Sequence, residues 1–132
     1  MPRQWVLIVD DDPLILQVLE EYVSGPQIRV TTASDALQAF IQARDLKPAL
    51  IISDIQMGHF GTGDSTLREM RKDERLRSIP FIFISGMEPE KAKLLIPSDD
   101  PKIRLMTKPI DFERLSAMIF ELTGLTISSD PA

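Results

Sequence analysis

Three acidic residues end a short apolar run near the start of the chain. Residues 6–9 read Val-Leu-Ile-Val, and Asp10, Asp11, Asp12 and Pro13 follow. A run without polar positions is typical of a parallel strand buried on both faces. Asp12 before proline predicts a helix N-cap, which leaves Asp10 and Asp11 at the carboxyl end of the strand, where α/β sheets place ligand sites. Their repulsion, on the order of 4 kcal/mol at ~4 Å, predicts a cation between them.

Three later predicted strands also end on polar or charged residues: 49–53 before Asp54, 81–84 before Ser85, and 103–106 before Thr107 and Lys108. Parallel strands lie ~4.8 Å apart with their carboxyl ends along one edge. Asp11 and Asp54 are therefore expected to share one ion, and the long Lys108 side chain to lean toward Asp54. Ligands that are all oxygen favour Mg²⁺, with Mn²⁺ as a second option. A metal beside a carboxylate, a hydroxyl and an ammonium suits phosphoryl transfer.

Strands and helices alternate along the whole chain. Apolar runs and helical periodicity predict strands at 4–9, 28–32, 49–53, 81–84 and 103–106, and helices at 12–24, 34–44, from about 64, at 89–95 and from 111 to 124. This alternation predicts an α/β fold, a doubly wound five-stranded parallel sheet with helices on both faces. The second strand ends without a charged residue, which favours an edge position and the order 2-1-3-4-5.

The second helix carries two local predictions. Ser34 is expected to act as its N-cap. Leu37, Phe40 and Ile41 are expected to form its buried apolar stripe.

Composition limits the class of protein. A chain of 132 residues, 43% hydrophobic and 27% charged, suits one globular domain. We expect that domain over residues 1–124 and a tail or linker stub over 125–132. The absence of cysteine excludes disulfides and thiolate sites. The net charge of -5 argues against direct nucleic-acid binding. Apolar runs shorter than the ~20 residues of a membrane span favour a cytoplasmic protein.

Four short motifs stand on successive strand ends: Val-Asp-Asp at 9–11, Ser-Asp-Ile-Gln-Met at 53–57, Ile-Ser-Gly at 84–86 and Thr-Lys-Pro-Ile at 107–110. Together and in this order they resemble the receiver domain of two-component response regulators, a flavodoxin-like fold. The resemblance covers essentially the whole chain. It implies a phospho-accepting signalling switch, not a metabolic enzyme. The phosphoryl donor would be a sensor histidine kinase or a histidine phosphotransfer protein.

The resemblance also implies a role for each site residue. Asp54 matches the phosphorylated aspartate. Asp11, Asp54 and the backbone carbonyl of Gln56 match direct Mg²⁺ ligands, and Asp10 matches the acid that reaches the ion through water. Ser85 matches the hydroxyl that bonds the phosphoryl group, and Lys108 the lysine that pairs with it. The Lys108–Pro109 bond is usually a cis peptide in such domains.

The chain departs from the family pattern near the output surface. Gly58 stands where proline is common, and the loop that follows is about one residue longer than usual. Leu105 replaces the usual aromatic switch residue, and Pro97 interrupts the fourth helix. The fourth helix, fifth strand and fifth helix form the usual output surface, so an atypical partner is expected. The resemblance also allows a dimer that forms on phosphorylation.

Three other functions are alternatives to the phosphoacceptor hypothesis. The departures favour a receiver-like interaction module that acts independently of phosphorylation. A Mg²⁺-dependent phosphatase with an aspartyl-phosphate intermediate generally needs a second acid two residues beyond the nucleophile, and Gln56 there cannot titrate. Flavin binding is weaker still, because the site is acidic where a phosphate needs donors.

Overall fold

A computed structural model describes residues 3–55, 63–96 and 100–127. The strands are β1 (Gln4–Val9), β2 (Ile28–Ala33), β3 (Leu50–Asp54), β4 (Phe81–Ser85) and β5 (Ile103–Thr107). The helices are α1 (Pro13–Val23), α2 (Ala36–Leu46), α3 (Gly63–Lys72), α4 (Pro89–Lys93) and α5 (Phe112–Thr123). All neighbouring strands pair in parallel in the order β2-β1-β3-β4-β5. The predicted fold class and strand order are confirmed.

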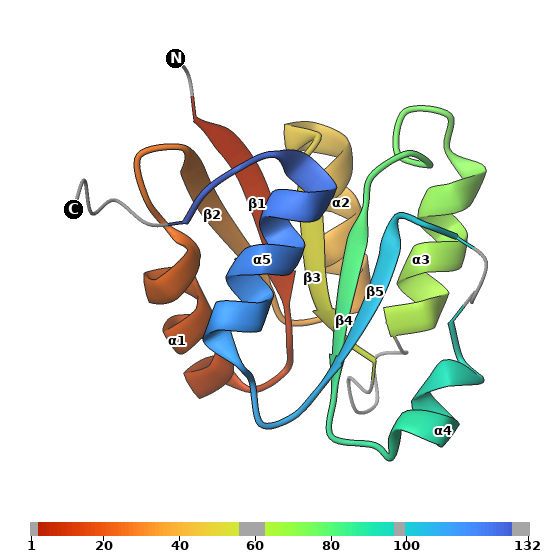
Figure 1. Ribbon diagram of the computed structural model, residues 1–132. Helices are drawn as coiled ribbons and strands as arrows, with labels where there is room; N and C mark the ends of the chain where they lie inside the picture. The colour runs from red at the N-terminus through yellow and green to blue at the C-terminus, as the bar shows by residue number, and fades with distance from the viewer. Residues whose placement is uncertain (1–2, 56–62, 97–99, 128–132) are drawn as a thin grey trace.

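Helices cover both faces of the sheet, with α1 and α5 on one face and α2, α3 and α4 on the other (Figure 1). Alternate residues of the central strands point into the two layers. Leu7, Ile51 and Phe83 pack toward α2 and α3, whereas Ile8 and Ile52 pack toward α1 and α5. Because both faces are buried, these strands carry no outward polar positions, which is why they form continuous apolar runs in the sequence.

Capping residues define the ends of α1 and α5. Asp12 accepts a hydrogen bond from the backbone N–H of Leu14 and caps α1 as predicted. Asp111 accepts one from Arg114 N at the start of α5, and Gly124 ends that helix with a φ of 77°. These contacts define where α1 and α5 begin, a few residues after the ends of β1 and β5.

For α2, the predicted N-cap was wrong and the predicted apolar stripe was right only at Phe40. Its N-cap is Asp35, whose side chain accepts from Gln38 N, and not Ser34. The helix faces the sheet through Ala39 and Ala43, with Phe40 partly buried beside them, whereas Leu37 is 70% exposed. The small alanines let the helix lie close to the sheet, and this rotation leaves Leu37 and Ile41 on the outer side.

Residues 125–127, which follow the C-cap of α5 at Gly124, pack onto the domain. Thr126 N donates to Gln27 Oε1 at 2.9 Å, and Ile127 is 7% exposed beside the α1–α5 layer. The tail expected from residue 125 therefore starts with a docked stretch. None of the helices in the described part of the chain has the length and hydropathy that a membrane span requires.

Candidate functional site

Three carboxylates converge where β1 and β3 end. Asp10 and Asp11 directly follow β1, and Asp54 is the last residue of the neighbouring β3. One oxygen from each of the three lies within 4.8 Å of the other two. Asp10 is 3% and Asp54 8% exposed, whereas Asp11 faces solvent. A compact set of oxygen donors, with one open to water, fits a hard divalent cation that keeps part of its hydration shell.

Lys108 supplies the positive charge nearest to these acids in the described structure. Its Nζ lies 3.3 Å from Asp54 Oδ2 and 3.9 Å from Asp10 Oδ2. Its backbone N–H donates to the carbonyl oxygen of Ser85 at 2.8 Å, which ties the residue after β5 to the end of β4. The Lys108–Pro109 peptide bond is cis. The lysine thus crosses β4 and reaches β3, as its strand-end position predicted.

Asp10 has an unusual acidity for an aspartate. Its pKa is raised from 3.8 to about 6, mainly by burial, and the charges of Asp54 and Asp11 contribute to this rise. The backbone N–H of Asp12, which donates to Asp10 Oδ1 at 2.9 Å, and the Lys108 ammonium act in the opposite direction. The carboxylate form of Asp10 is therefore short of compensating positive charge, and a divalent cation would provide it.

Ser85 is the hydroxyl on the neighbouring strand end. It is fully buried, and its Oγ accepts a hydrogen bond from Met87 N at 3.0 Å. Asp54 is in register with Ile84, so Ser85 stands one residue further along the adjacent strand. The hydroxyl therefore links the site edge to the first residues of the chain that leads into α4.

Gln56 lies outside the described residues, so its expected carbonyl ligand stays a prediction. Leu105 lies within β5, partly buried against the layer under α2 and α3. Its position agrees with a packing residue of that layer.

A family model for the response regulator receiver domain matches residues 6–120, most of the chain. The chain belongs to this family. Response regulator Rre1 of Synechocystis sp. is 28% identical over 130 residues, 96% of this chain and 54% of Rre1. The chain thus spans about half the length of that relative. The polar-differentiation response regulator DivK of Brucella anthropi is 25% identical over 130 residues, which cover 94% of this chain and 98% of DivK.

A solved structure shares the fold of this receiver domain. The receiver domain of sensor histidine kinase PA1611 from Pseudomonas aeruginosa superimposes with a TM-score of 0.79 at 24% identity. The match covers 94% of this chain and 100% of that one. At this identity the comparison concerns the fold alone. That protein carries a magnesium ion coordinated in its active site cleft.

The sequence analysis did not predict an apolar hollow beside the start of α1. Leu14, Ile15, Val18 and Ile110 line an apolar hollow between the start of α1 and the residues before α5. Leu14 follows the Asp11–Asp12 pair closely and Ile110 stands two residues after Lys108. A signal was present, because Leu14 and Val18 are four residues apart and so share one side of a helix.

Proposed function

We propose that this receiver domain accepts a phosphoryl group on Asp54 from a phosphohistidine donor and thereby switches a protein-interaction surface. The observation that carries the proposal is the ion pair between Lys108 Nζ and Asp54 Oδ2, set among three converging carboxylates. An ammonium at this distance can pair with a phosphoryl oxygen once the carboxylate becomes an acyl phosphate. The same geometry favours this function over a module that acts independently of phosphate.

The covalent step balances without a redox partner. A carboxylate oxygen of Asp54 attacks phosphorus and forms the P–O bond of an acyl phosphate. The P–N bond of the donor phosphohistidine breaks, and its electron pair stays on the imidazole that leaves. Lys108 pairs with the transferred oxygens, and the Ser85 hydroxyl donates to one of them.

The three acids would hold Mg²⁺, with Asp11 and Asp54 as direct ligands and Asp10 acting through water. The backbone carbonyl of Gln56 completes this proposed set. Bound Mg²⁺ would supply positive charge to the phosphoryl oxygens in the transition state. The magnesium in the cleft of the Pseudomonas receiver domain supports this cofactor by analogy of fold.

The apolar hollow supports a docking position for the donor protein. Its walls adjoin the site in sequence, since Leu14 follows Asp12 and Ile110 follows Lys108. Leu14 is 71% exposed at this position. A donor must bring its phosphohistidine to Asp54, so a sensor histidine kinase or a phosphotransfer protein with an apolar helical surface fits this hollow.

Phosphorylation is tested with acetyl phosphate and Mg²⁺. We expect the intact mass to rise by one phosphoryl group, with hydroxylamine removing it from an acyl phosphate. Asp54→Asn and chelation of Mg²⁺ should each abolish the gain. An equal mass gain in Asp54→Asn would refute the assignment of the acceptor.

The docking position is tested by comparing two donors. We expect Leu14→Ser to slow transfer from a phosphorylated histidine protein about tenfold, since it removes a buried apolar contact at the interface. Phosphorylation by acetyl phosphate should stay unchanged, because that donor needs no protein surface. Leu37→Ser, equally exposed but on α2, serves as the matched control. Equal slowing with both donors would contradict the docking role.

A further inference from the structure

The sheet has two free edges, because β2 and β5 each pair with one neighbouring strand only. Alternate residues of a strand direct their backbone N–H and C=O groups to opposite sides. Every second residue of an edge strand therefore offers unpaired groups to any strand that approaches, including one from a second copy of the chain. The contacts that these outward residues make decide how much of each edge is open.

The even-numbered residues of β2 face away from the sheet. The carbonyl oxygen of Gln27 accepts a hydrogen bond from Gln4 N at 2.9 Å, and that of Ala33 accepts one from Asp10 N at 3.1 Å. Residues 27 and 33 thus face β1, and by alternation the even-numbered residues between them face outward. The outward residues of β2 are Ile28, Val30 and Thr32.

Two contacts block the edge of β2, one at each end. At the start, Ile28 and Gly25 exchange backbone hydrogen bonds, with N–O distances of 3.2 Å and 3.1 Å. At the other end, Gln42 of α2 donates from Nε2 to the carbonyl oxygen of Thr32 at 2.8 Å. The Oε1 of Gln42 accepts from Thr31 Oγ1, and this second contact orients the amide so that its N–H groups face the strand.

The odd-numbered residues of β5 face away from the sheet. Phe81 N donates to the carbonyl oxygen of Lys102 at 3.0 Å, and Lys108 N donates to that of Ser85 at 2.8 Å. Residues 102 and 108 thus face β4, and the odd-numbered residues between them face outward. The outward residues of β5 are Ile103, Leu105 and Thr107.

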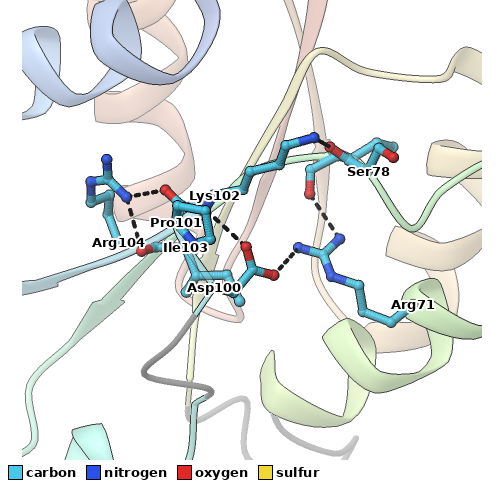
Figure 2. Close-up of polar contacts among 8 residues, drawn as sticks. Arg71, Ser78, Asp100, Pro101, Lys102, Ile103 and Arg104 are labelled. Carbon is cyan, nitrogen blue, oxygen red and sulfur yellow. Dashed lines mark hydrogen bonds and ion pairs between the residues drawn. The ribbon is translucent and has the colours of Figure 1, made fainter.

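Arg104 blocks the first part of the β5 edge (Figure 2). Its Nη1 donates to the carbonyl oxygen of Pro101 and, at 3.3 Å, to that of Ile103. Ile103 N donates to the carbonyl oxygen of Asp100 at 3.2 Å, and Pro101 has no backbone N–H to offer a partner strand. Both backbone groups of Ile103 are therefore already bonded within the chain.

The turn that enters β5 is held in place from α3. Arg71 Nη2 lies 3.3 Å from Asp100 Oδ2, and Asp100 Oδ1 accepts from Lys102 N at 2.9 Å (Figure 2). Arg71 Nη1 also donates to the carbonyl oxygen of Ile79 at 2.9 Å. The side chains of this ion pair are both mostly buried. These contacts fix the turn, so the carbonyl oxygen of Asp100 stays within reach of the strand edge.

We propose that Gln42 and Arg104 keep the two free edges of the sheet from pairing with a strand of a second copy of this chain. A strand added at an edge is held by backbone hydrogen bonds to successive outward residues. In the described structure, Val30 is the outward residue of β2 with both backbone groups open, and on β5 these residues are Leu105 and Thr107. Loss of either side-chain donor frees an outward carbonyl and lengthens the open stretch. The inference does not depend on the proposed phosphorylation.

Sedimentation equilibrium of the unphosphorylated protein without Mg²⁺ tests both residues. Gln42→Met and Arg104→Met keep a long side chain but remove its hydrogen-bond donors. We expect each variant to self-associate at about tenfold lower concentration than wild type, because each copy contributes one more backbone acceptor to the pairing. Gln38→Met and Arg114→Met are the matched controls, since their side chains make no hydrogen bond to an edge strand in the described structure. Both should behave as wild type.

Amide hydrogen exchange locates the surface at which the variants associate. Pairing along β2 should slow exchange at the outward amides of residues 30 and 32 at least about fivefold in Gln42→Met. Pairing along β5 should slow residues 105 and 107 by a similar factor in Arg104→Met. Association through any other surface leaves these amides as fast as in the monomer, and would overturn the proposal.

Two shorter replacements test the contacts without adding apolar surface. Gln42→Asn and Arg104→Gln keep a polar side chain that ends further from the strand edge, so each should associate in the same way but less strongly than the methionine variant. This pair decides the outcome if a methionine variant does not fold. The proposal is refuted if the folded variants associate no more than wild type and the controls.

Discussion

Asp10 and Asp11 are the same residue type in neighbouring positions, yet their surroundings differ. Asp10 is nearly inaccessible to solvent and accepts a hydrogen bond from Asp12 N, whereas Asp11 faces water. Burial is the main reason that the pKa of Asp10 rises to about 6. The folded chain without a cation therefore carries a carboxylate at a cost to its stability.

When no divalent cation is present, replacing Asp10 with a neutral residue should stabilise the folded chain. The pKa of Asp10 is about 6 in the folded chain, above the ordinary aspartate value of 3.8. The folded state thus holds the proton more tightly, and stability falls as the pH rises from 3.8 to 6. Above pH 6 the full cost, about 3 kcal/mol for such a shift, is present.

We therefore expect Asp10→Asn to raise the free energy of unfolding by about 1–3 kcal/mol at pH 7.5 in chelator, with the gain vanishing toward pH 4. Urea denaturation of both proteins across this range measures it. The Asp11→Asn substitution, at the exposed neighbouring position, should raise the free energy of unfolding by less. A gain for Asp10→Asn that is the same at every pH would rule out the ionisation of Asp10 as its cause.

Helix ends show how local signals can point to the wrong neighbour. Ser34 and Asp35 are both good N-cap residues, and the sequence alone favoured the first. In the fold Asp35 has the extended backbone of a cap, with φ −152° and ψ 171°, and its carboxylate accepts from Gln38 N. Ser34 instead contacts the Gln38 side chain.

These two residues give a matched pair of variants. We expect Asp35→Ala to lower the free energy of unfolding by about 1 kcal/mol, since the first turn of α2 loses its side-chain acceptor. Ser34→Ala should change it by less than about half of that. Thermal or urea denaturation of the two variants measures the difference. If Ser34→Ala lowered the free energy of unfolding more than Asp35→Ala, Ser34 and not Asp35 would be the N-cap of α2.

At the scale of the molecule, the end of the chain closes the layer of α1 and α5. Leu125 to Ile127 return to the turn after α1, near the start of β1 (Figure 1). An ideal Cβ at Gly25 would lie 2.8 Å from the carbonyl oxygen of Ile127, so the backbones meet closely there. The stretch after α5 is thus part of the core packing.

We expect Ile127→Ala to lower the free energy of unfolding by about 2 kcal/mol, because the side chain is nearly fully buried. Thr126→Ala is the control, since the contact of Thr126 with Gln27 uses its backbone N–H. Chemical denaturation distinguishes the two. An Ile127→Ala protein as stable as the control would show that residues 125–127 behave as a free tail.

The sequence by itself determined the order of elements and the edge at which the site forms. Short runs without polar positions are typical of buried parallel strands, and the charged residues at the ends of such strands meet along one edge of the sheet. Asp54, Ser85 and Lys108 were found in this way. The sequence also predicted three helix-capping residues correctly: Asp12, Asp111 and Gly124. Capping depends on residues only a few positions apart, so it can be predicted from local sequence.

Tertiary structure decided what depends on distant partners. The different burial of Asp10 and Asp11 is set by the packing around the end of β1, which local sequence does not encode. Arg71 and Asp100 are 29 residues apart, and Gln27 and Thr126 are 99 apart. No periodicity links such positions. The rotation of α2 that exposes Leu37 likewise depends on how closely its alanines approach the sheet, a choice made only when the layers pack.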